Sequence, residues 1–292
     1  MSMISLLEFL VKSLSYLPDF LIDIISKNMG YVIYFLDYRH RKIALDNLEH
    51  AFKDKTHQER SKICIGVYQH LLRLFFERIK VHRIPFEILQ QNLIWEGREY
   101  YDLYLKSNGA LYLTGHCGNW EMFTAFGPKM ALLKSVLVRR VKNRAFENLL
   151  RKLREYHGCQ VIYKGPRLRR MLDSLRHGEQ IGVLNDQDAG ANGVFVPFFG
   201  RLASMHAGMV EAAIKQGVEI FPLFMIREPG HWIFRAILLP PIVTDISASL
   251  EQQVKDVLMQ FSVYLEQTIR RFPEQWLWLH RRWKTRPKVG IE

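Results

Sequence analysis

The sequence has few cysteines and no long uninterrupted apolar segment. Its three cysteines, Cys64, Cys117 and Cys159, have no CxxC spacing, which argues against a disulfide framework and against a thiolate metal site. No charge-free apolar stretch reaches the roughly 18 residues that a clean membrane-spanning helix needs. The cysteine usage predicts a reducing compartment. The N-terminus lacks a basic leader and a small-x-small cleavage site, so we expect no secretory signal peptide.

Acidic residues are outnumbered by basic ones. The 292 residues include 41 Lys and Arg against 29 Asp and Glu, a formal net charge of +12. Such a charge favours an anionic partner: nucleic acid, an anionic membrane surface, a phosphorylated substrate or an acidic protein. With 48% hydrophobic and 24% charged residues, the composition is that of a globular protein and excludes disordered, collagenous and polytopic membrane chains.

The N-terminal region predicts two apolar helices. Residues 4–17 and 19–36 each carry a narrow polar stripe at helical spacing, and Pro18 separates them. A basic run at residues 39–42 follows. We interpret residues 1–36 as a separable helical hairpin that lies in the interface of an anionic bilayer. The alternative is a buried helical hairpin of a soluble core.

The rest of the chain divides into a helical segment, 37–95, and a segment, 96–292, in which strands and helices alternate. Short apolar runs predict strands at 110–114, 135–139, 159–163, 181–184, 219–226 and 232–239. Helical patterns lie between or after them at 120–131, 144–156, 167–177, 205–216 and 249–272. This alternation predicts an α/β fold whose largely parallel central sheet is flanked by helices, with functional loops at the carboxyl ends of the strands.

One histidine and glutamate pair stands out by its context. In LYLTGHCGNWEMF, His116 follows a predicted buried strand, and Glu121 lies five residues later at a strand-to-helix turn. Gly115 and Gly118 permit an irregular turn, and Asn119 is suited to cap the helix that carries Glu121. We expect Glu121 to accept a hydrogen bond from one imidazole nitrogen, which leaves the other as a general base. The structural alternative is a capped helix with a satisfied histidine.

The five-residue spacing between His116 and Glu121 is by itself weak evidence for a catalytic pair. The same offset separates two other pairs, His82 with Glu87 and His206 with Glu211. The second pair would lie about 140° apart on one helix, and Pro85 interrupts the first.

Five blocks in order carry a resemblance to a known family. GHCGNWE, then LVRRVKN with LREYHG, LNDQDAGANGVFVPFFGRLASM, FPLFMIRE and finally PEQWLWLHRRWKTRP together resemble the lipid A biosynthesis secondary acyltransferases. These lauroyl and myristoyl transferases belong to the wider lysophospholipid acyltransferase superfamily. The resemblance covers roughly residues 38–288.

The resemblance implies a reaction and a set of residues. His116 and Glu121 would form a catalytic dyad that moves an acyl chain from acyl carrier protein to a hydroxyl of a lipid A precursor, without a covalent acyl-enzyme. Arg154 and Asp186 would lie near the site. A lysophospholipid or another glycolipid is the alternative acceptor. The resemblance also implies that the protein is located at the cytoplasmic face of the bacterial inner membrane.

Local pattern adds a binding role for several residues. On a helix over 144–156, Arg154 would lie at the edge of the cleft, where it could hold a phosphate or polarise the thioester carbonyl. Asp186 and Gln187 follow a predicted strand, where α/β sites collect. Asn119, in the turn after His116, is a further candidate for substrate binding. Arg139 belongs to a basic stretch, residues 139–154, with seven cations against one Glu. The alternatives are solvated cations for the arginines and loop capping for Asp186.

Two other readings compete. Cys117, next to His116, could serve a Cys-His thioesterase, but adjacent residues leaving a strand point to opposite sides. The basic segments 139–154, 167–170 and 280–288 could bind nucleic acid, but no recognition motif accompanies them, and a phosphorylated lipid and an acidic carrier account for the same charge. We expect no metal and no cofactor, since thioester acyl transfer needs neither a glycine-rich phosphate loop nor a metal cluster.

Overall fold

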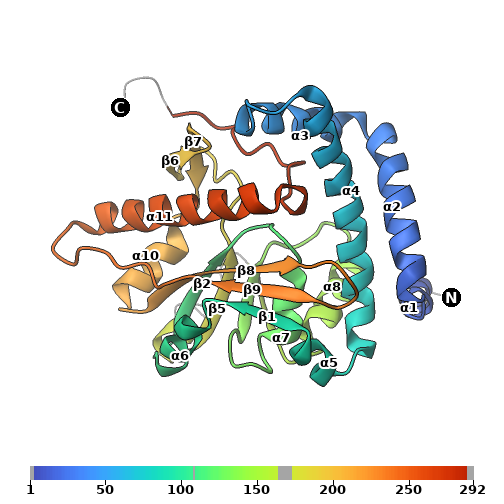
Figure 1. Cartoon of the computed structure of the whole chain (residues 1–292). Helices are drawn as coiled ribbons and strands as arrows, with labels where there is room; N and C mark the ends of the chain where they lie inside the picture. Colours follow the sequence, from blue (N-terminus) through green and yellow to red (C-terminus); the bar gives the residue numbers. More distant parts are fainter. Residues whose placement is uncertain (1–2, 108, 164–172, 288–292) are drawn as a thin grey trace.

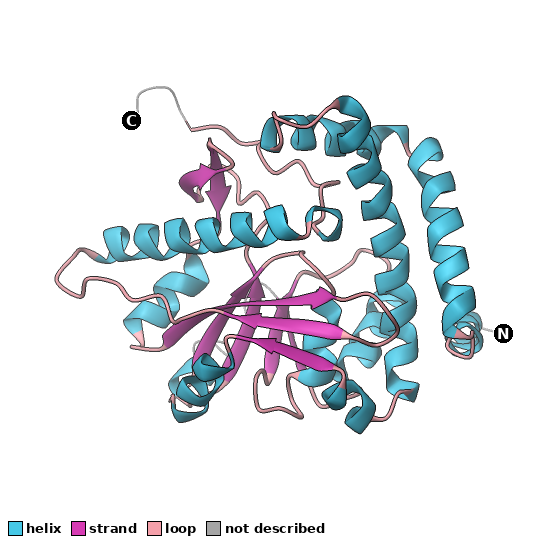
Figure 2. Ribbon diagram, viewed as in Figure 1, coloured by secondary structure: helices cyan, strands magenta, loops and turns pink. Residues whose placement is uncertain are grey.

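The computed structural model describes residues 3–107, 109–163 and 173–287. Figure 1 labels its elements, and Figure 2 separates helices from strands. The helices are α1 (Met3–Leu14), α2 (Asp19–Leu36), α3 (Tyr38–Ala51), α4 (His57–Lys80), α5 (Phe86–Gln91), α6 (Arg98–Lys106), α7 (Phe123–Phe126), α8 (Arg144–Glu155), α10 (Gly208–Lys215) and α11 (Leu250–Arg271), with 3₁₀ turns η1 (Val81–Arg83), η2 (Trp120–Met122) and η3 (Pro273–Gln275). The strands are β1 (Leu93–Glu96), β2 (Ala110–Thr114), β3 (Ser135–Val138), β4 (Gln160–Tyr163), β5 (Gln180–Leu184), β6 (Val194–Phe198), β7 (Arg201–Met205), β8 (Glu219–Arg227) and β9 (Phe234–Leu238).

A mostly parallel sheet forms the centre of the fold, which confirms the predicted α/β class. Its seven strands follow the order β1-β9-β8-β2-β5-β3-β4. The five strands from β8 to β4 run parallel, whereas β9 pairs antiparallel with β8, and β1 pairs parallel with β9. The carboxyl ends of β2, β5, β3 and β8 therefore meet at one edge, where the functional loops were expected.

Both faces of the sheet are covered. Leu111 and Leu113 of β2 belong to one apolar cluster, and Ala110 and Tyr112 belong to another on the opposite face. All five residues of β2 are buried. A strand covered on both sides is apolar throughout, and this is why the run ALYLT could be placed from the sequence. Figure 1 shows α10 and α11 on one side of the sheet and α7 and α8 on the other.

The N-terminal helix α2 packs against the helical segment that follows it. α2 lies alongside the long helix α4 in Figure 1 and buries Ile22, Ser26, Gly30 and Tyr34. A Cβ on Gly30 would lie 2.7 Å from the Cα of Gln69, so a residue without a side chain lets the two helices approach closely. That residues 1–36 are separable from the part of the chain in which strands and helices alternate stays a prediction.

No helix in the part of the chain that the structure describes is both long and apolar enough to cross a bilayer. Membrane association of the N-terminal helices stays a prediction.

Several elements differ from the predictions. The strands β1, β6 and β7 were not predicted; Pro197 lies inside β6, and Phe199 and Gly200 in the β6–β7 turn both have positive φ, 50° and 73°. Pro disfavours a strand assignment, and Phe is an uncommon residue at positive φ, so the pattern hides this hairpin. The helix expected at 120–131 ends at Phe126, before Gly127 and Pro128. The helix expected at 167–177 and the basic segment 167–170 lie largely or wholly outside the described residues.

Candidate active site

A clamped loop follows β2 and carries the predicted histidine. The backbone N–H of Gly118 donates to the carbonyl of Gln275 at 2.8 Å, and that of Asn119 donates to the carbonyl of Met225 at 2.7 Å. Gly118 has φ 69°, and a Cβ there would lie 2.0 Å from the carbonyl oxygen of Met225. The loop therefore needs glycine at this position and is held from two sides, by β8 and by the segment after α11.

Asp186 orients the imidazole of His116. The Nδ1 atom of His116 lies 2.7 Å from Oδ1 of Asp186, and the backbone N–H of His116 donates to Oδ2 at 2.7 Å. The indole of Trp276 also donates to Oδ2, at 2.8 Å. With Nδ1 donating its proton to Asp186, Nε2 carries the lone pair of the neutral ring. The ring retains 18% exposure and contacts Trp120 edge to face.

The Asp186 carboxylate is held in its ionised form. Burial alone raises the pKa of Asp186, but the charge that His116 carries when it is protonated and the hydrogen bonds from His116 and Trp276 outweigh burial and lower this pKa to about 2. A carboxylate fixed in this way holds the imidazole in one orientation and stabilises it once it is protonated.

Glu121 does not occupy the place we predicted for it. It forms a bidentate ion pair with Arg154, in which Arg154 Nε donates to Oε2 at 3.0 Å and the terminal NH2 group donates to Oε1. Arg78 Nε lies 3.5 Å from the same carboxylate. Burial raises the pKa of Glu121, but Arg154, Arg78 and His116 together lower it below its ordinary value. The expectation that Glu121 accepts the imidazole hydrogen bond is therefore wrong, because Asp186 takes that position.

Arg154 is more enclosed than the helical pattern suggested, and the second arginine here, Arg78, is buried. Arg154 has 16% side-chain exposure and turns inward to Glu121 instead of lying at an open edge. Arg78 is 3% exposed, and burial lowers its pKa to about 10 despite the attraction of Glu121. The cluster of Arg78, Arg154 and Glu121 thus holds two cations against one carboxylate close to His116.

Asn119 also differs from its expected role. Its side chain makes no cap to η2 and instead donates from Nδ2 to Oε2 of Glu77 at 2.7 Å. Arg139 is exposed just after β3, and Gln187 is partly exposed next to Asp186. The structure thus brings His116, Asn119, Glu121, Arg154 and Asp186 together and leaves Arg139 on the surface near them.

Cys117 is enclosed in the core next to the site. It is fully buried in the apolar cluster that includes Trp276 and Phe224. Burial and the nearby Asp186 raise the pKa of its thiol far above the ordinary value. The thioesterase reading needs an ionised, accessible thiol, and this geometry opposes it.

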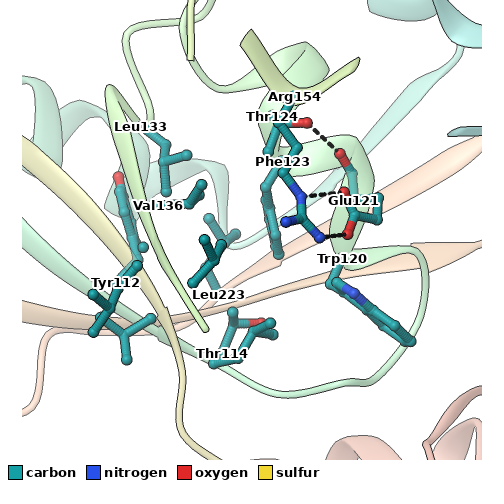
Figure 3. A pocket seen from close by; sticks show the side chains of 15 residues that line it. Tyr112, Thr114, Trp120, Glu121, Phe123, Thr124, Leu133, Val136, Arg154 and Leu223 are labelled. Carbon is teal, nitrogen blue, oxygen red and sulfur yellow. Dashed lines mark hydrogen bonds and ion pairs between the residues drawn. The ribbon is translucent and has the colours of Figure 1, made fainter. Parts of the chain in front are cut away.

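An apolar pocket opens beside these groups. Figure 3 shows Glu121 and Arg154 paired at one side of the pocket, with apolar side chains around the rest. Its walls come from β2, β3, β5, β8 and the η2–α7 segment, and they include Tyr112, Thr114, Trp120, Phe123, Leu133, Val136, Leu137, Val138, Val183, Leu184 and Leu223. Trp120 is shared between the pocket wall and the ring contact with His116. Among the described residues, no group of three His, Cys, Asp or Glu side chains is placed to hold a metal ion.

Trp276 and a polar row on α4 were not predicted from the sequence. Trp276 belongs to the segment PEQWLWLHRRWKTRP, and the sequence predicts no role for it. His70, Arg73, Glu77 and Arg78 recur at helical spacing, and all four are buried although they are polar. The regular spacing of these polar residues is the signal in the sequence that marks the row.

Comparison with known proteins bears on this geometry. Residues 2–285 match the family described as bacterial lipid A biosynthesis acyltransferase. The lipid A biosynthesis lauroyltransferase of Escherichia coli is 33% identical over 123 residues, which cover 41% of this chain and 39% of that protein. Lipid A biosynthesis acyltransferase 2 of Shigella flexneri is 22% identical over 295 residues, 95% of this chain and 88% of that protein. A phosphatidylinositol mannoside acyltransferase of Mycolicibacterium smegmatis is 25% identical over 182 residues, 60% of this chain and 57% of that protein.

Proposed function

Because the chain belongs to the bacterial lipid A biosynthesis acyltransferase family, we propose that it moves a fatty acyl chain from a thioester to a hydroxyl of a phosphorylated glycolipid. The observation that carries this proposal is the 2.7 Å contact between His116 Nδ1 and Asp186 beside an apolar pocket. Acyl carrier protein is the favoured donor and a lipid A precursor the favoured acceptor. The similarity to a phosphatidylinositol mannoside acyltransferase supports the alternative of another glycolipid acceptor.

The proposed mechanism uses His116 as a general base. Its Nε2 takes the proton of the acceptor hydroxyl while the hydroxyl oxygen attacks the thioester carbonyl. The C–S bond then breaks, the acyl group remains on the acceptor oxygen, and the imidazolium returns its proton to the leaving thiolate. Asp186 stabilises the imidazolium through Nδ1. No acyl-enzyme forms, in keeping with the burial of Cys117.

The pocket is the proposed site of the acyl chain. Its walls are almost wholly apolar, which suits a hydrocarbon chain, and its polar residues Glu121 and Arg154 lie where the thioester would enter. The excess positive charge of Arg78 and Arg154 over Glu121 stabilises the negative charge that develops on the carbonyl oxygen.

The donor docking surface is proposed from charge. Arg139, Arg140, Lys142 and Arg144 are exposed just after β3, whose last residue, Val138, lines the pocket. An acidic carrier protein bound there would place its thioester near the pocket mouth. Arg154 does not belong to this surface, because its side chain is paired with Glu121 in the site. Lys288, the last residue of the basic segment 280–288, lies outside the described part of the chain.

The proposed membrane surface is one side of α2 and its neighbours. Phe20, Ile24, Tyr31 and Phe35 are each at least 50% exposed and share a stripe of α2 that faces away from its buried residues. Leu36 at the end of α2 and Tyr38 at the start of α3 are also exposed, and so are Lys27, Arg39 and Lys42. Aromatic side chains with cations suit the interface of an anionic bilayer, which we place at the cytoplasmic face of the bacterial inner membrane.

The decisive experiment tests whether His116 is the general base. His116→Ala should lower kcat by about 10²-fold to 10⁴-fold while the protein remains folded. Cys117→Ala is the matched control in the adjacent position and should retain most activity, with no stable acyl adduct in mass spectrometry after mixing with donor alone. Activity of His116→Ala within a few-fold of wild type would overturn the mechanism.

Substrate identity needs a parallel comparison. A lipid A precursor and a lysophospholipid should each be offered with acyl carrier protein and coenzyme A thioesters, at two salt concentrations. We expect preference for the lipid A precursor and the carrier, and salt-sensitive affinity for the carrier. Preference for the lysophospholipid would reject the acceptor while retaining the mechanism.

A further inference from the structure

A row of buried polar residues on α4 faces the loop that carries the site. His70, Arg73, Glu77 and Arg78 are between 1% and 7% exposed. Buried charged groups destabilise a fold unless they are paired, and a packed apolar helix face would serve the core better. Packing of the core alone therefore does not account for these four buried polar residues.

The row contacts successive parts of the loop. His70 Nε2 lies 3.0 Å from the carbonyl oxygen of Gly118, and Glu77 Oε2 accepts from the amide of Asn119 at 2.7 Å. Arg78 lies beside Glu121. The turn between His116 and η2 is thus held from α4 at three points.

Glu77 is the centre of this network. Its second oxygen, Oε1, accepts from Arg73 Nε at 2.9 Å, and Arg73 also forms an ion pair with Asp23 of α2. Asp23 in turn contacts His231 Nε2 at 2.7 Å. The carboxylate of Glu77 therefore joins the loop to α2, the helix that carries the proposed membrane surface.

We propose that Glu77 is a positioning residue of the acyl transfer, which acts through Asn119 to hold the loop of His116 and Glu121 in its productive geometry. This inference rests on the proposed function. A displacement of about 1 Å at a reacting group costs about 10²-fold in rate, so a contact three residues from His116 is close enough to matter.

The chemistry of the pair supplies a sharp test. Glu77 uses one oxygen for Asn119 and the other for Arg73, and Glu77→Gln replaces one of these two acceptors with a donor. In Asn119→Asp, two carboxylates face each other. The double variant Glu77→Gln with Asn119→Asp reverses the donor and the acceptor, because the new amide at position 77 would donate to the new carboxylate at position 119 and still accept from Arg73.

Kinetics are measured with lauroyl acyl carrier protein and a lipid A precursor. Each single variant should lower kcat by about 10-fold to 100-fold with little change in KM, and the double variant should recover most of the loss. The matched control is Asp19→Asn, which removes another α2–α4 ion pair, the 2.8 Å contact with Lys80, without touching the loop. It should leave kcat near the wild-type value.

A second measurement does not depend on turnover. The imidazole signals of His116, assigned by their loss in His116→Ala, should shift in NMR spectra of Glu77→Gln and return toward wild type in the double variant. Unfolding midpoints of all variants check the fold, and Asn119→Ser, which adds no charge, replaces Asn119→Asp if that variant does not fold.

The outcomes separate the two hypotheses. A wild-type protein that transfers no acyl chain to either acceptor would overturn the proposed function itself, and an active His116→Ala would overturn its mechanism. An inactive His116→Ala together with a Glu77→Gln that keeps wild-type kcat and an unchanged His116 signal would overturn the inference alone. A loss of kcat that follows the loss of folded protein and is not recovered in the double variant would also overturn it.

Discussion

Asp186 and Glu121 differ in what they contact, and that difference predicts different variants. Asp186→Asn keeps the size of the side chain but replaces an acceptor with a group that can donate to Nδ1, which favours the wrong tautomer of His116. We expect kcat to fall by about 10³-fold to 10⁴-fold with a smaller change in KM. Steady-state kinetics check this. Wild-type kcat in Asp186→Asn would show that His116 needs no anionic partner.

His70 should make stability depend on pH. Burial lowers its pKa to about 4, whereas an unfolded chain has a value near 6.5. The unfolded state therefore binds the proton more tightly, and the stabilisation by neutral His70 is complete above about pH 6.5 and lost as pH falls toward 4. The effect is on the order of 3 kcal/mol at most.

The variant His70→Gln isolates this effect, because Gln can still donate to the Gly118 carbonyl but does not titrate in this range. Urea unfolding at several pH values should show the free energy of unfolding falling more steeply between pH 6.5 and 4 in wild type than in the variant. Parallel curves would show that His70 does not contribute. His157, whose pKa burial also lowers to about 4, is present in both proteins and cancels in the comparison.

At the scale of the elements, β5 limits the pocket. A Cβ on Gly182 would lie 2.3 Å from Cδ1 of Leu133, which lines the pocket, so that side chain must move. We expect Gly182→Ala to shorten the space for the acyl chain and to shift preference toward shorter chains by about 10-fold per lost methylene. Competition among decanoyl, lauroyl, myristoyl and palmitoyl thioesters measures this shift.

The control for the pocket is Gly208→Ala in α10, where an added Cβ meets nothing within 4 Å. It should leave the chain-length profile unchanged. The same profile in wild type and Gly182→Ala would place the acyl chain elsewhere.

The packing of α2 on α4 predicts a matched pair of variants. Ile22 is 1% exposed and Ile24 is 53% exposed on the same helix. Ile22→Ala should lower the free energy of unfolding by about 2–5 kcal/mol, and Ile24→Ala should change it by less than about 0.5 kcal/mol. Equal effects in denaturant unfolding would mean that α2 is not docked in solution.

At the scale of the whole molecule, charge and exposed aromatic residues should act together in membrane binding. Phe20→Ser with Phe35→Ser removes two exposed side chains that would each contribute about 1.5–3 kcal/mol if fully buried in lipid. Sedimentation with vesicles of phosphatidylglycerol and phosphatidylethanolamine should show at least about 10-fold weaker binding, and added salt should weaken binding of both proteins.

Ile246→Ser provides the control, because Ile246 is 93% exposed in a loop remote in sequence from α2. It should bind vesicles like wild type. An equal loss of vesicle binding in Ile246→Ser and in the double variant Phe20→Ser with Phe35→Ser would indicate nonspecific adsorption instead of a defined surface.

Local pattern determined much of the architecture. The strand at 110–114 coincides with β2, and helices at 19–36 and 144–156 agree with α2 and α8 to within one residue, because buried strands and amphipathic helices have regular apolar spacing. The β6–β7 hairpin could not be found in this way, because its Pro and its Phe at positive φ contradict local preference and are held by tertiary packing.

The sequence by itself determined the fold class and the position of His116 at the end of a strand, and the resemblance to a known family implied Asp186 and Arg154 near it. Only the tertiary structure decided which carboxylate contacts which cation. Asp186 and Glu121 both follow elements that reach the same edge of the sheet, and spacing along the chain cannot distinguish them. Their partners depend on the packing of α4, α8 and the segment of Trp276, which lie far apart in sequence and meet only when the sheet is covered on both faces.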